Sequence, residues 1–338
     1  DGAGTKAWDR RFGGSSDDHL FALIPTQDGG YLLGGSSYSV ADGDKSETSR
    51  GQDDYWVVKI DSGGGKIWDR RFGGTSYDDL IALIPTPDGG CLLGGYSYSG
   101  AGGDRSEASR GQDDYWVVKI DGSGGKVWDK RFGGSSSDDL GALIPTPDGG
   151  SLLGGYSDSG AEGDKGEASR GVFDYWVVKI DGGGVRLWDK RFGGLYYDAV
   201  HSLIPTPEGG YLLGGLSFSG AGGDKSQASR GGGDYWVIHM DIDRDCDGRM
   251  DGAEALAGTD PTNDASYLAV SDISQASGLV NLRWHGGQSA TQIVERTTSL
   301  INPAWVPAFT NIPPTEINNL LQVGETNPAS VYRIRVQR

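Results

Sequence analysis

An acidic segment around residue 247 contains the side chains whose types and spacing suggest chemistry most directly. Its sequence, DIDRDCDGRMDGAE from position 241, fits the calcium-loop pattern D-x-D-x-D-G with an acid at the twelfth position. Ca²⁺ takes about six to eight oxygen ligands in a flexible geometry. We therefore expect a Ca²⁺ site here, with a solvated acidic linker as the alternative. Its ligands would be Asp243, Asp245, Asp247, the backbone carbonyl of Arg249, Asp251 and Glu254.

Long glycine-rich connections carry a second set of polar residues that recurs every 60 positions. If these connections share one rim of the fold, their arginines and the aromatic rings of Tyr98 and Phe218 could bind a glycan or a protein. The alternative, which we favour, is that Arg and Asp pair inside each loop and hold its polar backbone. The residues are Asp44, Arg50 and Asp54, then Asp104, Arg110 and Asp114, then Asp164, Arg170 and Asp174, then Asp224, Arg230 and Asp234.

Catalytic patterns are lacking elsewhere in the sequence. The four histidines occupy unrelated positions, and a carboxylate pair for glycoside hydrolysis depends on a separation that only the fold determines. We therefore predict that the chain is not an enzyme, and we rank an extracellular enzyme such as a glycosidase third among the possible functions.

Two sets of tryptophans reveal the elements that must position these residues. Each set repeats at intervals of 60, so four copies of one unit occupy residues 1–240. A period of this size is typical of propellers and solenoids, in which no unit buries its apolar face alone. The sets are Trp8, Trp68, Trp128 and Trp188, and Trp56, Trp116, Trp176 and Trp236.

Short apolar runs bounded by Gly, Asp and Pro predict four strands in each copy. In the second copy these are residues 80–85, 91–96, 115–120 and 126–132, with a tight turn at 87–90 and a long connection from 97 to 114. The third strand is apolar on both faces, so it must be covered on both sides. Similar four-stranded sheets stacked face to face meet that need, as in the blades of a propeller.

The repeat resembles the kelch type of blade in its Gly94-Gly95 pair, its Tyr115-Trp116 pair and Trp128. It is also similar to the DYWVVKID-type repeats of secreted bacterial surface proteins. This resemblance covers about 240 residues and implies an all-β, four-bladed β-propeller with little chemistry attached.

The first copy begins within a unit, because residues 6–12 match a fourth strand, and the fourth copy ends at residue 240 without one. We expect the N-terminal strand to complete the last blade. Within one molecule this would close a ring, which we favour because linked ends have a high effective concentration. Between molecules it would build a head-to-tail polymer.

Three domains are expected: the propeller at 1–240, a calcium-binding linker at 241–264 and a small β-sandwich at 265–338. The linker resembles thrombospondin type-3 and EF-hand-like motifs, which implies that Ca²⁺ stiffens the joint. Alternation predicts strands at 278–284, 292–296 and 331–336. The last region is similar to fibronectin-like modules around Trp284 and Val294-Glu295-Arg296.

Composition indicates a secreted protein. The net charge of −17 disfavours nucleic acid and anionic membranes, and no apolar run is long enough for membrane insertion. Asp1 at the start is what a mature chain has after signal-peptide removal, so we expect an extracellular or cell-surface location. Cys91 takes a variable repeat position and is expected at the surface. A disulfide between Cys91 and Cys246 stays open.

Together these features predict a non-enzymatic secreted structural or adhesive protein, of which the repeating subunit of an extracellular polymer or filament is one form. Its partners would be further copies, other surface proteins or glycans. The main alternative is a monomeric glycan- or protein-binding module.

Overall fold

The computed structural model describes residues 4–207, 209–242, 268–276, 279–286, 291–298, 304–312, 318–324 and 331–337. In these residues the structure is all β, which confirms the predicted class, and none of them forms a helix able to cross a membrane. The chain divides into two compact parts. One contains Asp1–Ile204 with Leu213–Ile238, and the other contains Pro205–Leu212 with His239–Arg338.

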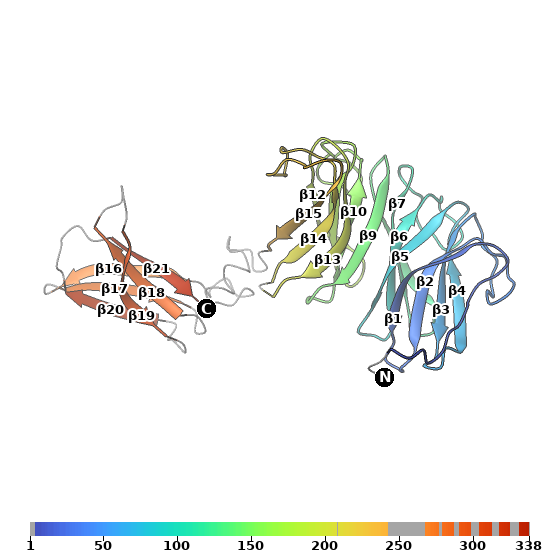
Figure 1. The fold of residues 1–338 in the computed structure, drawn as a ribbon, viewed down its shortest axis with the longest axis horizontal. Helices are drawn as coiled ribbons and strands as arrows, with labels where there is room; N and C mark the ends of the chain where they lie inside the picture. Colours follow the sequence, from blue (N-terminus) through green and yellow to red (C-terminus); the bar gives the residue numbers. More distant parts are fainter. Residues whose placement is uncertain are drawn as a thin grey trace. The chain divides into compact units, whose positions relative to one another are not determined.

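Three complete repeats form four-stranded antiparallel sheets, each with its strands in chain order (Figure 1). Repeat 1 contains β1 (Asp18–Pro25), β2 (Tyr31–Ser37), β3 (Asp54–Ile60) and β4 (Lys66–Phe72). Repeat 2 contains β5 (Asp78–Pro85), β6 (Cys91–Ser97), β7 (Asp114–Ile120) and β8 (Lys126–Phe132). Repeat 3 contains β9 (Asp138–Pro145), β10 (Ser151–Ser157), β11 (Asp174–Ile180) and β12 (Arg186–Phe192). The predicted strands of the second copy are confirmed within two residues at each end.

Glycine fixes the local geometry at two places in each repeat. Gly89 has a φ of +81° in the predicted turn, where the Thr86 amide donates to the Gly90 carbonyl at 3.0 Å. Gly95 lies opposite a bulge between Leu80 and Ala82, and a Cβ there would be 1.8 Å from the Asp79 carbonyl oxygen. These glycines therefore set the turn and allow β5 and β6 to approach closely.

Repeat 4 has three strands, β13 (Asp198–Pro205), β14 (Tyr211–Ser217) and β15 (Asp234–Met240), in one sheet. The prediction that residues 6–12 complete this sheet within the molecule is wrong for this structure, because these residues form no strand and the ring is not closed. Repeats 1 and 4 lie at opposite ends of the row of sheets (Figure 1).

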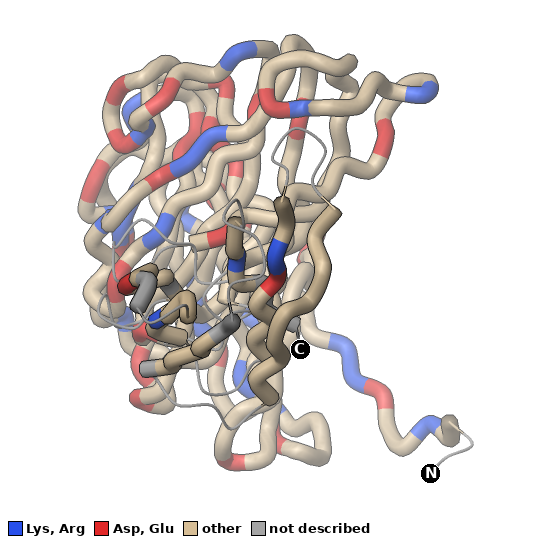
Figure 2. The backbone as a smooth tube through the Cα atoms, turned by 90° about the vertical axis from the view of Figure 1, so that its left-hand side faces the viewer, with Lys and Arg blue, Asp and Glu red and all other residues tan. Residues whose placement is uncertain are grey.

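Part of the N-terminal segment, residues 4–14, contacts repeat 1 instead, although residues 4–11 remain exposed. Phe12 joins the buried cluster of Trp56, Val58 and Ile60. Trp8 lies against Gly64 as Trp68 of β4 lies against Gly124 of the following repeat. The segment therefore takes the place that the fourth strand of a preceding repeat would occupy, and its first residues extend from the array as an arm (Figure 2).

The C-terminal part forms two three-stranded antiparallel sheets, as the predicted sandwich requires. Leu282, Trp284 and Val294 form their shared core, and the Trp284 indole donates to Gln292 Oε1 at 2.6 Å. One sheet has the order β16-β17-β20 and the other β19-β18-β21. The strands are β16 (Ala269–Ala276), β17 (Leu279–His285), β18 (Thr291–Thr297), β19 (Val306–Asn311), β20 (Asn318–Gly324) and β21 (Val331–Gln337).

Candidate functional site

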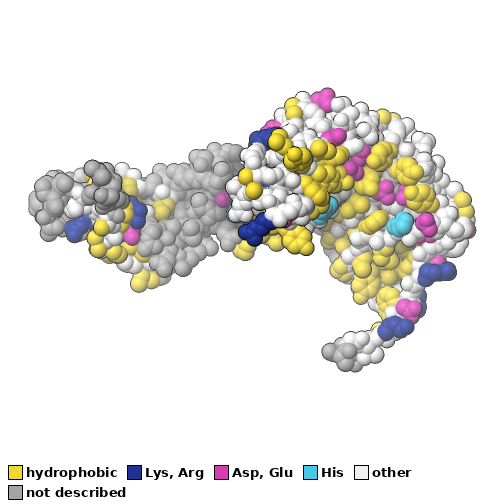
Figure 3. Space-filling model, turned by 45° about the horizontal axis from the view of Figure 1, so that its top comes forward, with side chains coloured by type: hydrophobic (Ala, Val, Ile, Leu, Met, Phe, Trp, Pro, Cys, Tyr) yellow, Lys and Arg dark blue, Asp and Glu magenta, His cyan; other side chains and the backbone are white. Residues whose placement is uncertain are grey.

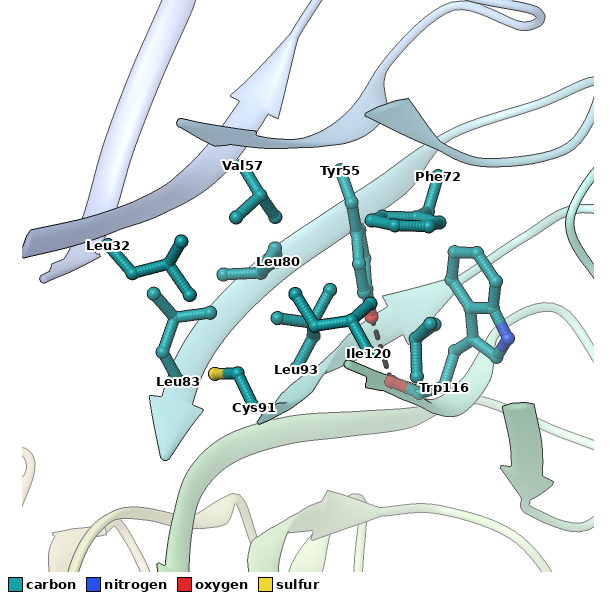
Figure 4. Close-up of a cluster of buried hydrophobic side chains, with 11 residues drawn as sticks. Leu32, Tyr55, Val57, Phe72, Leu80, Leu83, Cys91, Leu93, Trp116 and Ile120 are labelled. Carbon is teal, nitrogen blue, oxygen red and sulfur yellow. Dashed lines mark hydrogen bonds between the residues drawn. The ribbon is translucent and has the colours of Figure 1, made fainter. Parts of the chain in front are cut away.

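The junctions between neighbouring repeats contain most of the buried apolar side chains of the array. At the first junction, Tyr55 and Val57 of β3 and Phe72 of β4 pack against Leu93 of β6 and Trp116 of β7 (Figure 4). The second junction repeats the arrangement with the equivalent residues, including Tyr115 and Trp176. Each complete repeat therefore has one face that receives the preceding repeat and one that covers the next.

A tyrosine on the third strand makes the same contact at every junction. The Tyr55 hydroxyl donates to the Trp116 carbonyl at 2.8 Å, and the two rings are 4.7 Å apart (Figure 4). Tyr115 meets Trp176 and Tyr175 meets Trp236 with hydrogen bonds of 2.9 Å and ring separations of 4.8 Å. The three tyrosines are fully buried, and the first two hydrogen bonds are buried with them, whereas the third is partly buried because Trp236 is partly exposed.

Arginines of the long connections pair across the junctions, not inside one loop as predicted. Arg50 binds Asp104 of the next repeat, and its own backbone amide donates to Asp54 at 2.7 Å. Arg110 Nη1 lies 2.5 Å from Asp164 Oδ2, and Arg170 Nη1 lies 2.6 Å from Asp224 Oδ2. Of the four predicted rim arginines, three therefore link one repeat to the next.

Repeat 4 presents the same covering face without a following repeat. Tyr235 is 95% exposed, although its equivalents Tyr55, Tyr115 and Tyr175 are fully buried, and Val237 is also exposed. Within the described residues, β15 has no strand on its outer edge and the Arg230 guanidinium has no hydrogen bond or ion pair. We call this surface the trailing face.

Repeat 1 presents the opposite, receiving face. Leu20 and Leu23 are 57% and 59% exposed, whereas the equivalent Leu80 and Leu83 are buried under repeat 1. The face surrounds an apolar cavity of about 330 Å³ whose lining includes Leu20, Leu23, Gly35 and Trp56. Hydrophobic side chains gather on the hollowed side of the array (Figure 3). We call this surface the leading face.

A buried cation inside each long connection was missed by sequence reasoning. Arg105 Nη1 donates to the Ser99 carbonyl at 2.7 Å and to Ser109 Oγ at 2.8 Å, which holds the loop on its strand. Lys45, Lys165 and Lys225 occupy the equivalent buried positions. These basic residues recur every 60 positions, directly after the repeated aspartate, and this recurrence could have identified them from the sequence.

The predicted aromatic residues of the rim are partly exposed. Tyr98 is 42% and Phe218 is 45% exposed, and each packs edge-on against a tyrosine of its own repeat, Tyr77 and Tyr197 respectively. Cys91 was expected at the surface, and this prediction is wrong. The residue is a free thiol buried in the first junction, and burial raises its pKa to about 12.

Two junctions also hold a pair of aspartates, one buried and one partly buried. Asp113 is fully buried beside Asp139 of the next repeat, and desolvation with the charge of Asp113 raises the pKa of Asp139 to about 8. Desolvation and the charge of Asp79 likewise raise the pKa of Asp53 to about 8. At the third junction the equivalent positions hold Phe173 and Ala199, so both acids are replaced together.

Stability should therefore fall as the pH rises. Unfolded Asp titrates near pH 4, so between about pH 4 and 8 the folded protein holds a proton at Asp139 that the unfolded chain loses. We expect the double variant Asp113→Asn with Asp139→Asn to melt higher than the wild type at pH 8, and this advantage to shrink towards pH 5. Thermal melting across this range measures it, and parallel curves for the two proteins would contradict the assignment.

The predicted Ca²⁺ ligands, Asp243, Asp245, Asp247, Arg249, Asp251 and Glu254, lie outside the described residues. Among the residues that are described, no group of three or more His, Cys, Asp or Glu side chains could hold a metal ion.

Comparison with known proteins gives a partial similarity. No protein-family model matches the chain. The regulatory protein FlaEY of Caulobacter vibrioides is 27% identical over an alignment of 164 residues that covers 46% of this chain and 17% of that protein. The chain thus covers less than a fifth of this relative, and the similarity assigns it no family.

Proposed function

We propose that this chain is a non-enzymatic, secreted structural protein that self-associates through the two ends of its repeat array and builds an extended extracellular assembly. The observation that carries the proposal is the exposure of Tyr235 at 95%, when the three equivalent tyrosines are fully buried. Apolar surface of this kind marks an interaction site when it is contiguous.

Each of the two end faces lacks the partner that the other could supply. The leading face lacks a covering repeat, and the trailing face lacks a repeat to cover and a fourth strand. The same faces would close a four-bladed propeller if both belonged to one chain. We favour association between chains, because repeats 1 and 4 lie at opposite ends of an open row of sheets (Figure 1) and β15 of the same chain is not paired with the N-terminal segment.

Light scattering over a range of concentrations tests the proposal. We expect a mass that rises with concentration well above the 35.7 kDa of one chain. The experiment should be done at about 0.15 M salt, because copies with a net charge of −17 repel one another more strongly at lower ionic strength. A constant mass of one chain would rule the function out.

We also propose that residues 241–264 bind Ca²⁺ and stiffen the region that follows the array, on the strength of the filled ligand pattern. Chelation should lower the melting temperature, because a ligand bound only by the folded state stabilises it. Asp245→Ala and Glu254→Ala should lower it equally, and chelation should not affect these variants further. Scanning calorimetry with and without Ca²⁺ measures the effect, and identical melting in both conditions would remove the site.

A monomeric glycan-binding module is the second candidate. Tyr38, Tyr98 and Phe218 occupy equivalent rim positions and are partly exposed, as stacking platforms for sugars would be. Glycan-array binding that weakens in Tyr98→Ala and Phe218→Ala would support it. A blank array would exclude it.

A further inference from the structure

The internal junctions define which atoms the two end faces would bring together. We propose that the partner of the trailing face is the leading face of a second copy, bound in the register of the internal junctions, with Tyr235 on Trp56 and Arg230 on Asp44. This inference rests on the proposed self-association and specifies its geometry.

The leading face has space where the tyrosine would insert. At the internal junctions the hydroxyl lies over the backbone of Gly95, Gly155 and Gly215, within 2.9 Å of the position a Cβ would take. Gly35 is the equivalent residue of repeat 1, and it lines the apolar cavity together with Trp56. The cavity therefore corresponds to the site of a tyrosine ring from a preceding repeat, and Tyr235 is the exposed tyrosine of that type.

Charge complementarity fixes the same register. Each internal arginine of the rim binds the aspartate 54 positions later, and this rule leaves Arg230 at one end and Asp44 at the other. Asp44 already accepts a hydrogen bond from the Gly13 amide at 3.3 Å, as Asp104 does from Gly73 at 3.2 Å. Asp44 is thus oriented like the paired aspartates, and among the described residues its carboxylate makes no ion pair, although Lys66 donates to its backbone carbonyl at 2.5 Å.

The N-terminal segment would supply the missing strand. In repeat 1, Tyr55 of β3 lies opposite Phe72 of β4, and Val57 lies opposite Arg70. The same register places Phe12 opposite Tyr235 and Arg10 opposite Val237 of the second copy. Since Phe12 already packs on Trp56, docking would bring the open edge of β15 beside residues 6–12 without moving them. Strand addition of this kind supplies main-chain hydrogen bonds to an exposed edge.

Charge reversal tests the register. Arg230→Asp and Asp44→Arg each place like charges at the junction, so each should weaken self-association at least about tenfold. An equimolar mixture should recover wild-type assembly, because every junction between the two variants joins opposite charges. Arg283→Asp, the same charge change at an exposed residue of β17, is the control and should assemble normally.

The outcomes separate the two proposals. If the wild-type chain stays monomeric at all concentrations, self-association itself is wrong. If the wild type assembles but the single variants assemble equally well, or the mixture recovers nothing, the register is wrong and self-association stands. Should Asp44→Arg fail to fold, Arg230→Asp still decides the matter, since Arg230 is exposed.

Discussion

Removing residues 1–14 should leave the chain monomeric at concentrations at which the full chain forms large assemblies. The deletion removes the strand that would pair with β15 of another copy, and it removes Phe12 from the cluster around Trp56. Both the main-chain hydrogen bonds and part of the apolar contact at the junction are lost. Light scattering of the two chains at equal concentration measures the change.

A peptide of residues 1–14 provides the matched experiment on the unaltered chain. In excess it should bind the open edge of β15 and shorten wild-type assemblies, whereas a scrambled peptide of the same composition should not. Large, ordered assemblies formed by the truncated chain would show that the segment has no part in the junction. Circular dichroism checks that the truncated chain keeps its strands, because the deletion also exposes Trp56.

Tyr115→Ala should destabilise the array strongly, whereas Tyr235→Ala should not. The Tyr115 ring is fully buried against Trp176, so truncation leaves a cavity and costs about 3–5 kcal/mol. Tyr235 is 95% exposed, and its truncation should change the unfolding free energy by less than about 0.5 kcal/mol. Urea unfolding of dilute protein measures both effects.

The same pair of variants separates folding from assembly. Tyr235→Ala should reduce self-association as strongly as the deletion of residues 1–14, although it leaves the monomer stable. Equal destabilisation by the two substitutions would contradict the difference in burial between these positions. Normal assembly of Tyr235→Ala would contradict its place in the junction.

Strands and turns could be predicted because their signals are local. The short apolar run around Trp116 and the turn ending in Gly90 are visible within a few residues, and the structure confirms both. Their recurrence every 60 residues made one repeat sufficient to describe all of them. The missing fourth strand of the last copy was evident for the same reason.

Relations between repeats could not be predicted, because a period identifies equivalent residues but not the rotation between neighbours. Arg50 precedes Asp54 by four residues and Asp104 by 54, and the sequence reasoning favoured an aspartate of the same loop, whereas the structure pairs the guanidinium with Asp104 of the next repeat. Whether the ring closes depends on the rotation between neighbouring repeats, which contacts such as that of Tyr55 with Trp116 set. The 60-residue period carries no information on this rotation. Cys91 was misplaced because variation among the copies at its position suggested exposure, although the site is an apolar pocket that accepts several side chains.

Electron microscopy of the purified full-length chain tests most directly the claim that one array continues into the next. We expect filaments in which four-stranded sheets follow one another without interruption, with the trailing face of each copy on the leading face of the next. Separate particles of four repeats at every concentration, whether open or closed into a ring, would contradict the account.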